Sequence, residues 1–267
     1  MAQVCVLAKE GSVYANMVLS ELANSQIDFD VVWIKKKKKK NRISNILLIP
    51  FNLYKSVSTG RFKSLSKLNW WTWSLFFKMR KQKVSSQLAQ KVRKYTSKKF
   101  DGVYMPGVNH VQTYSYLNTN SYDIGILAGV DIVHELILNE FKTVCLNAHP
   151  APLPECRGGG ALENTLLQNL QPSSSVHRVT GGIDEGEIYK VKEITLEKND
   201  NFKSIYLKLN VLGASLLASV TKNILAGDPL DVTENKGKLN YWKDLTIDKQ
   251  KKAHDNLTKM LKQKEVV

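Results

Sequence analysis

VCVLAKEGSVYANMVLSELANSQIDFDVVWI, residues 4–34, is the stretch that decides the fold class. Two short β-rich runs, Val4–Leu7 and Phe29–Ile34, flank a segment, Gly11–Ser25, in which apolar residues recur at near-helical spacing. Those apolar residues are Val13, Met17, Leu19 and Leu22. The stretch therefore predicts a strand, a helix and a second strand.

The same alternation continues further along the chain. We expect a polar helix around Ser85–Lys98, followed by strands at Gly102–Met105, Asp123–Gly129 and Val144–Asn147. Short apolar runs that alternate with helices are typical of a parallel sheet buried on both faces. The sequence therefore predicts an α/β fold whose ligands bind beyond the carboxyl ends of the strands.

The composition is that of an ordinary globular protein. The chain has 267 residues, of which 43% are apolar and 24% charged, which excludes disordered, collagen-like and disulfide-stapled classes. Apolar spacing predicts a long packed helix within Asn201–Gly227. We expect one domain over residues 1–240 with an insertion at 35–100, and a basic helical tail at 241–267 that frays or lies on the surface.

The positive charge is concentrated in one segment. The net charge is +15, yet residues 35–100 hold 20 Lys and Arg and no Asp or Glu. The 19 basic and 24 acidic residues elsewhere give the rest of the chain a net charge of −5. The segment begins with six lysines, Lys35–Lys40, and contains an aromatic cluster flanked by further basic residues: Trp70, Trp71, Trp73, Phe76 and Phe77.

Three interpretations fit this basic segment. Lys and Arg beside Trp suit an anionic membrane surface, which residues 35–83 would contact. The same residue types bind RNA by phosphate contacts and base stacking. A solvated lysine loop followed by a helix that packs on the core needs no ligand, and it carries the most weight. Among partners, the membrane is favoured over RNA.

Cysteine usage indicates a reducing compartment. Cys5, Cys145 and Cys156 are odd in number and far apart, so they provide neither a disulfide framework nor a CxxC metal clamp. The first residues lack a signal-peptide pattern, and no run approaches the roughly 18 apolar residues of a membrane span. We expect a cytoplasmic protein, peripherally bound to a membrane if the basic segment meets lipid.

The densest polar cluster, NAHPAPLP at residues 147–154, directly follows an apolar strand. Alternate side chains of a strand share a face, so Asn147 and His149 point the same way. Pro150 and the two prolines after it end the strand and stiffen the turn. The sequence RGGG at 157–160 then opens a helix from Ala161 and lets backbone approach a neighbour closely.

A second cluster, SVHRVTGGIDEGEI at residues 175–188, predicts a strand, a glycine-rich turn and another strand over Ile188–Ile194. Asp184 lies between the glycines and is well placed to be displayed into a cleft. Taken singly, such residues are usually structural: a histidine at a strand end is a hydrogen-bonder, an aspartate beside glycine is a turn former and an asparagine near proline is a cap.

Together the two clusters resemble the folate-dependent formyltransferases, most of all those that act on amino sugars. The pattern is Asn-x-His-Pro-x-x-Leu-Pro, then Arg-Gly, then Val-His followed seven residues later by Asp-x-Gly. It is carried by Asn147, His149, Pro150, Leu153, Pro154, Arg157, Gly158, Val176, His177, Asp184 and Gly186. Ile126–Gly129 also resembles the family's strand before its pterin-binding loop. The likeness covers residues 100–195 well and the beginning only as a generic strand–helix–strand unit.

The resemblance implies a Rossmann-like, doubly wound, mostly parallel sheet that transfers a formyl group from 10-formyltetrahydrofolate to an amine. Asn147, His149 and Asp184 match the catalytic trio: the first two donate to the oxyanion, and Asp184 orients His149 and assists proton transfer. Residues edging the pterin pocket would be Gly129, Asp131, Ile132, Val133, Thr180, Gly181 and Gly182. No metal is required, and the Leu153–Pro154 bond resembles one that is cis in relatives.

The resemblance leaves four acceptors to weigh: methionyl-tRNA, glycinamide ribonucleotide, a nucleotide-linked amino sugar, and water in the deformylases. The tRNA enzymes carry a carboxyl-terminal barrel, whereas 72 residues follow position 195 here. The purine enzymes have a more glycine-rich loop than Lys9–Val13, and the deformylases carry an amino-terminal regulatory domain. We therefore expect an amino-sugar N-formyltransferase of polysaccharide biosynthesis.

Two rival classes remain. A Cys–His hydrolase would use Cys145 or Cys156 with His149 or His177, although buried strand cysteines are usually inert. A binding protein on an inactive scaffold would not need the intact trio of Asn147, His149 and Asp184.

Overall fold

The computed structural model describes residues 2–35, 83–236 and 246–263. The chain divides into two units. Met1–Lys36 and Val84–Val267 make up the first unit, and Lys37–Lys83 is the second. The aromatic cluster and nearly all of the basic segment lie outside the described residues, so the hypotheses about that segment stay predictions. The domain boundaries expected at 35–100 and 241 likewise stay predictions.

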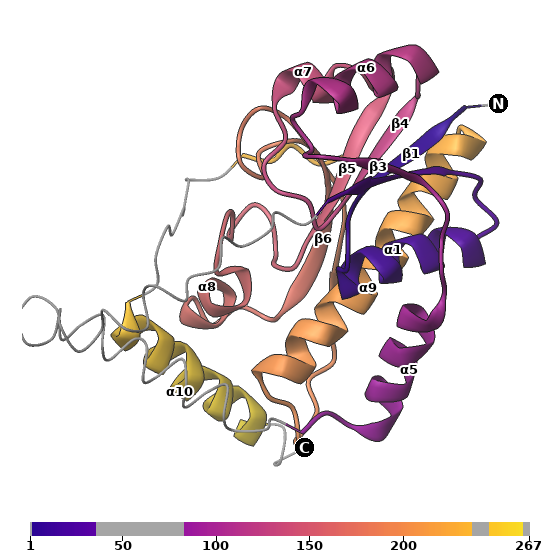
Figure 1. Ribbon diagram of the computed structural model, residues 1–267. Helices are drawn as coiled ribbons and strands as arrows, with labels where there is room; N and C mark the ends of the chain where they lie inside the picture. The colour runs from indigo at the N-terminus through magenta and orange to yellow at the C-terminus, as the bar shows by residue number, and fades with distance from the viewer. Residues whose placement is uncertain (1, 36–82, 237–245, 264–267) are drawn as a thin grey trace, which may run out of the picture. The chain divides into compact units, whose positions relative to one another are not determined.

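A seven-stranded mixed sheet forms the centre of the first unit (Figure 1). Its order is β3-β2-β1-β4-β5-β6-β7; pairings from β3 to β5 are parallel, whereas β5–β6 and β6–β7 are antiparallel. The strands are β1 (Val4–Lys9), β2 (Asp30–Ile34), β3 (Val103–Met105), β4 (Ile124–Ala128), β5 (Val144–His149), β6 (Ser173–Arg178) and β7 (Ile188–Glu193). The α/β class is confirmed, and the parallel part occupies the first five strands.

Helices cover both faces of the sheet (Figure 1). On one face lie α1 (Val13–Asn24), α5 (Ser86–Ser97) and α9 (Phe202–Ala226), packed on the alternate residues Val4, Val6 and Ala8 of β1. On the other face, α6 (Val111–Asn120) and α7 (Glu135–Leu138) pack on Cys5 and Leu7. Burial of β1 on both faces explains why its sequence is continuously apolar.

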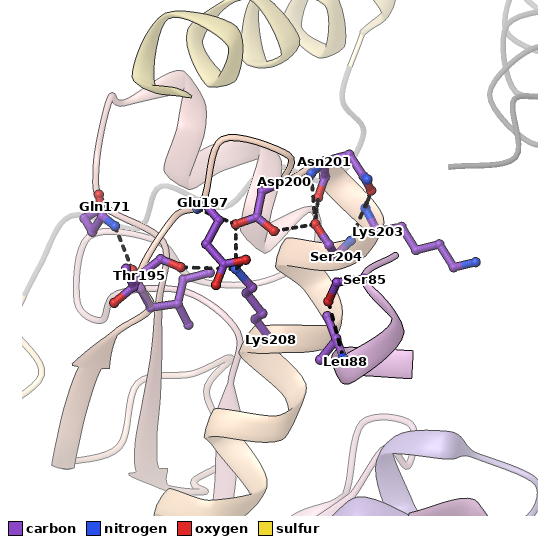
Figure 2. Close-up of polar contacts among 11 residues, drawn as sticks. Ser85, Leu88, Gln171, Thr195, Glu197, Asp200, Asn201, Lys203, Ser204 and Lys208 are labelled. Atoms are coloured by element: carbon purple, nitrogen blue, oxygen red, sulfur yellow. Dashed lines mark hydrogen bonds and ion pairs between the residues drawn. The ribbon is translucent and has the colours of Figure 1, made fainter. Parts of the chain in front are cut away.

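The long helix α9 packs across one face of the sheet, against β5 and β6. It begins with a capping box, in which the Asn201 side chain accepts from the backbone N–H of Ser204 and the Ser204 hydroxyl accepts from that of Asn201 (Figure 2). Gly213 lets the helix approach closely, because a Cβ there would lie 3.2 Å from the Cβ of Ala148.

In length and composition α9 could span a membrane, contrary to the expectation that no run comes close. Half of its most apolar window is buried inside this protein. Packing against β5, β6 and α1 accounts for that apolar character.

The carboxyl-terminal helix α10 (Ile247–Gln263) does not fray: it is a helix with most of its residues exposed or half-buried and one narrow face packed. Ala253 and Leu257 are buried against α8 (Ala161–Leu167). The buried Asn256 side chain donates to the carbonyl oxygen of Leu166 at 2.8 Å. The three positions lie on one face at spacings of three and four, so this short stripe is sufficient to dock a lysine-rich helix.

A tight contact under β4 gives a test of the fold. A Cβ on Gly125 would lie 2.6 Å from the ring of Phe141. We expect Gly125→Ala to lower the free energy of unfolding by about 1–3 kcal/mol, since overpacking forces the ring to move. Thermal denaturation measures the effect. Gly107→Ala is the matched control, because its new methyl group meets no atom within 4 Å among the described residues; equal losses in both variants would contradict the packing account.

Candidate active site

At the end of β5, the amide of Asn147 and the imidazole of His149 lie on the same face of the sheet. Ala148 faces α9, so Asn147 and His149 face the opposite side, as strand alternation predicts. Asn147 is partly exposed and His149 is buried. Nε2 of His149 is buried and has no hydrogen-bond partner among the described residues, which leaves a nitrogen ready for an incoming group.

A second imidazole comes from the antiparallel neighbour. His177 of β6 is paired with Asn147, and directly opposed residues of such strands bring their side chains together. Nδ2 of Asn147 lies 3.3 Å from Nε2 of His177, and Nδ1 of His177 lies 2.8 Å from the carbonyl oxygen of its neighbour Arg178. The carbonyl fixes the proton on Nδ1, so Nε2 is the acceptor nitrogen for Asn147.

Asp184 lies beside both imidazoles and can accept a hydrogen bond from Nδ1 of His149. Its Oδ2 lies 3.3 Å from Nδ1 of His149, and its Oδ1 lies 3.4 Å from Nε2 of His177. The backbone N–H of Gly158 also donates to Oδ2 at 2.8 Å. Asn147, His149 and Asp184, predicted from distant parts of the sequence, therefore meet in one cluster around His177.

Burial controls the charge of both histidines. Desolvation lowers the pKa of His149 below its ordinary value, and the attraction of Asp184 and a hydrogen bond with the Cys156 backbone only partly offset this. Desolvation likewise lowers the pKa of His177; Asp184 opposes it, while His149 and Arg157 lower the pKa further. Both imidazoles are therefore neutral near pH 7. With Nδ1–H of His149 directed at Asp184, its free Nε2 carries a lone pair and can accept a proton.

The proline loop after β5 is held by one buried hydroxyl. Ser175 accepts from the backbone N–H of Leu153 at 3.0 Å and donates to the carbonyl oxygen of Ala151 at 2.7 Å. The Leu153–Pro154 peptide bond is cis, so that prediction is confirmed. The loop therefore has one defined course next to His149.

The residues predicted to edge a pterin pocket lie on two neighbouring loops. Gly129 follows β4 with a φ of 73°, Val133 is buried, and Ile132 is 71% exposed. Asp131 is exposed and forms an ion pair with Lys9 at 3.4 Å. On the second loop Gly181 packs against Glu135, just past the first loop, and any Cβ at 181 would lie 2.2 Å from Oε1 of Glu135. Thr180 is exposed and Gly182 half-buried.

The cysteines fit a structural role. Cys145 faces the apolar cluster under α6 and α7, and burial raises the pKa of its thiol. Burial also raises the pKa of Cys156. Since the thiolate is the reactive form, the hydrolase hypothesis loses its nucleophile. Within residues 2–35, 83–236 and 246–263, no group of three His, Cys, Asp or Glu side chains is arranged to hold a metal.

Two parts of the site were not predicted as site residues. His177 was considered only as a hydrolase candidate, although the Val-His pair in the motif was a signal for it. Asn235 carried no signal, because it lies in a polar stretch beyond α9. Its side chain nevertheless donates to the carbonyl oxygens of Asp184 and Gly186 at 2.8 and 2.9 Å.

A sequence profile of the formyl transferase family matches residues 79–221, more than half of the chain. The chain belongs to the formyl transferase family. This is a family of enzymes, and the match includes Asn147, His149, His177 and Asp184.

Curated relatives of this formyl transferase family member are methionyl-tRNA formyltransferases. One from Wolbachia pipientis subsp. Culex pipiens (strain wPip) is 36% identical over 115 residues, 42% of this chain and 38% of that protein. Another from Rickettsia canadensis is 31% identical over 156 residues, 53% of this chain and 51% of that protein. The chain thus spans about half or less of the length of these relatives.

Solved structures share the fold at low identity. A 4-N formyltransferase from Francisella tularensis superposes with a TM-score of 0.54 at 14% identity, over 95% of this chain and 86% of that one. An N-formyltransferase from Helicobacter canadensis, in complex with folinic acid and dTDP-3-aminofucose, gives 0.51 at 15% identity, over 91% and 71%.

The neutral, buried histidines predict acid-sensitive stability. Because their folded pKa values lie below the unfolded value of about 6.5, the unfolded chain binds more protons as the pH falls past that value. The free energy of unfolding is therefore highest above about pH 6.5 and declines below it. Urea unfolding at about pH 7.5 and 5.5 measures the decline, which should be smaller in His177→Gln; equal declines in the variant and the wild type would contradict the account.

Proposed function

We propose that this protein transfers a formyl group from 10-formyltetrahydrofolate to a primary amine, the amino group of a nucleotide-linked sugar. The convergence of Asn147, His149 and Asp184 carries the proposal, since formyl transfer needs an oxyanion donor and a proton acceptor around one carbonyl. The reversal of strand order between β1 and β4 supports the Rossmann-like, doubly wound description.

The two loops at 129–133 and 180–186 suit the formyl donor. Gly181 lies against the side chain of Glu135, the first residue of the helix that follows the first loop. Backbone groups of Gly129, Asp131, Ile132, Val133, Thr180, Gly181 and Gly182 would hold the pterin ring there. The unpartnered Nε2 of His149 marks where the formyl group would lie.

In this proposal the proton of the amine moves through His149. As the amine attacks the formyl carbon, Nε2 of neutral His149 accepts the proton that the amine loses, and Asp184 stabilises the imidazolium. Nδ2 of Asn147 has a second N–H free to donate to the oxyanion, because only one is directed at His177. His149 then returns its proton to the nitrogen of the departing tetrahydrofolate, so the formamide forms with no net change in protonation.

A structural relative supports a nucleotide-sugar acceptor, because the Helicobacter canadensis N-formyltransferase was solved with dTDP-3-aminofucose. The chain also has a cavity of about 500 Å³ between α1, α5 and α9. That cavity lies on the face of the sheet that α9 covers, whereas Asn147 and His149 face the opposite side, so we do not assign it to the acceptor.

Methionyl-tRNA is the second candidate acceptor, and the sequence comparisons favour it. The curated relatives above 30% identity are methionyl-tRNA formyltransferases. The shared segment contains the transfer chemistry and does not by itself select between the two acceptors.

A panel of acceptors tests the function. We expect tetrahydrofolate release when 10-formyltetrahydrofolate is supplied with a nucleotide-linked amino sugar, and none above background with methionyl-tRNA, glycinamide ribonucleotide or water alone. Asn147→Ala should lower kcat about 100- to 1000-fold, since one oxyanion donor is lost. Asn139→Ala, at an exposed position, is the matched control.

Two results would contradict this proposal in different ways. Turnover with methionyl-tRNA alone would replace the acceptor and keep the chemistry. Absence of turnover with every acceptor, or full activity in Asn147→Ala, would overturn formyl transfer by this cluster.

The activity should also depend on pH through His149. Since the neutral imidazole accepts the proton, kcat/KM should fall as the pH drops through the lowered pKa of His149. Asp184→Asn removes the carboxylate that raises this pKa, so the acidic limb should move to lower pH while kcat falls at least tenfold. Comparing both enzymes with one acceptor cancels the titration of its amine, and an acidic limb at higher pH in the variant would refute the assignment.

A further inference from the structure

The backbone of Asp184 is strained. Its φ is 51°, in the left-handed region that a residue with a side chain seldom adopts. Such a conformation persists only where neighbouring contacts impose it. Something in the structure must therefore hold this residue in place.

Asn235 supplies the holding contacts on the backbone. Its Nδ2 donates to the carbonyl oxygens of Asp184 and Gly186 at 2.8 and 2.9 Å, on both sides of Glu185. One amide thus spans the turn and fixes the direction of the backbone at Asp184. Thr233, two residues earlier, exchanges two backbone hydrogen bonds of 2.9 Å with Ile188 and docks this segment at the start of β7.

Arg157 holds Asn235 in turn. Its buried guanidinium donates through Nη2 to the backbone oxygen and to Oδ1 of Asn235, at 2.6 and 2.7 Å. The next residue, Gly158, donates its N–H to Oδ2 of Asp184. The contacts are therefore linked. Arg157 holds Asn235, Asn235 holds the backbone of Asp184, and Gly158, the residue after Arg157, holds the carboxylate of Asp184.

We propose that Asn235 is a positioning residue for the reaction, which with Arg157 aims the Asp184 carboxylate at His149 and His177. This inference rests on the proposed function for its kinetic consequence, whereas its structural consequence can be measured without turnover. Asn235 acts through Asp184 and touches neither imidazole in any hydrogen bond or ion pair of the described chain.

The test uses two variants and one control. Asn235→Ala removes all contacts of the side chain. Asn235→Asp removes the two N–H donors and keeps an acceptor for Arg157, so the segment stays docked if the alanine variant fails to fold. Glu234→Ala, at the exposed neighbour whose side chain pairs with Lys236, is the matched control.

The first readout is the titration of the two imidazoles by NMR, with signals assigned from His149→Asn and His177→Asn. The charged and titratable groups that act on them are Asp184, Arg157 and the imidazoles themselves. If the Asp184 carboxylate is no longer directed at His149, the pKa of His149 should fall in Asn235→Ala, in the same direction as in Asp184→Asn. Asn235→Asp adds a carboxylate of its own, so it is compared by its kinetics. An unchanged titration, equal to that of Glu234→Ala, would overturn the proposal even in a protein that shows no turnover.

The second readout is kinetic. We expect the Asn235 variants to lower kcat about tenfold to a hundredfold with little change in KM, because small misplacements of a catalytic group are costly. In an Asp184→Asn background the same substitution should cost less than twofold, since the aimed carboxylate is already gone. An equal loss in both backgrounds would show a merely structural role and overturn the proposal, while an inactive wild-type enzyme would refute the proposed function and leave the titration to decide.

Discussion

One carboxylate lies against two buried imidazoles: Nδ1 of His149 and Nε2 of His177 each lie within 3.4 Å of an oxygen of Asp184, and Nδ1–H of His149 is directed at it. This arrangement depends on three separate pieces of chain, the end of β5, the end of β6 and the loop that follows β6. The pairing of β5 with β6 places Asn147 opposite His177. Asp184 is not part of a strand but lies in the loop between β6 and β7. The site therefore forms only if that loop is held against the ends of β5 and β6.

Charge balance explains why this cluster tolerates burial. A buried ion is costly unless another charge or hydrogen bonds compensate it. Here the histidines are neutral, and the carboxylate of Asp184 accepts a hydrogen bond from the backbone N–H of Gly158 at 2.8 Å. The buried guanidinium of Arg157 lies 3.9 Å from the carboxylate of Glu185 and donates two hydrogen bonds to Asn235. In the proposed reaction, moving a proton to His149 would create an ion pair with Asp184 and raise the net charge of the protein groups by one, which the oxyanion would match.

Much of the fold and of the candidate site could be predicted from the sequence, and the features that were not predicted have physical explanations. Strand alternation placed Asn147 and His149 on one face, and short apolar runs located the strands of the parallel part. The helix α6 was not predicted, because it consists largely of Thr, Asn, Ser and Tyr. These are weak helix formers, and the segment shows no helical repeat of apolar residues. The packing of α10 was not predicted, because only Ala253, Asn256 and Leu257 are buried among the described side chains of this lysine-rich helix. The direction of β6 was not predicted, and with it the contact between Asn147 and His177, because strand polarity depends on tertiary packing. Asn235 acts through tertiary hydrogen bonds that no local pattern encodes.

The length of the loop between β6 and β7 follows from the same geometry. Residues 179–187 separate the two strands, whereas antiparallel neighbours need only two to five connecting residues. The loop leaves β6 where the N–H of Val179 bonds to the carbonyl oxygen of Cys145, and it must return across Asn147 to bring Asp184 to His149. Extra length costs little closure entropy, but a long loop is not rigid by itself. Gly186 lets it rejoin the sheet, since a Cβ there would lie 2.1 Å from the carbonyl oxygen of Arg178. The contacts that hold Asp184, and that its proposed role requires, therefore come from outside the loop, from Gly158 and Asn235.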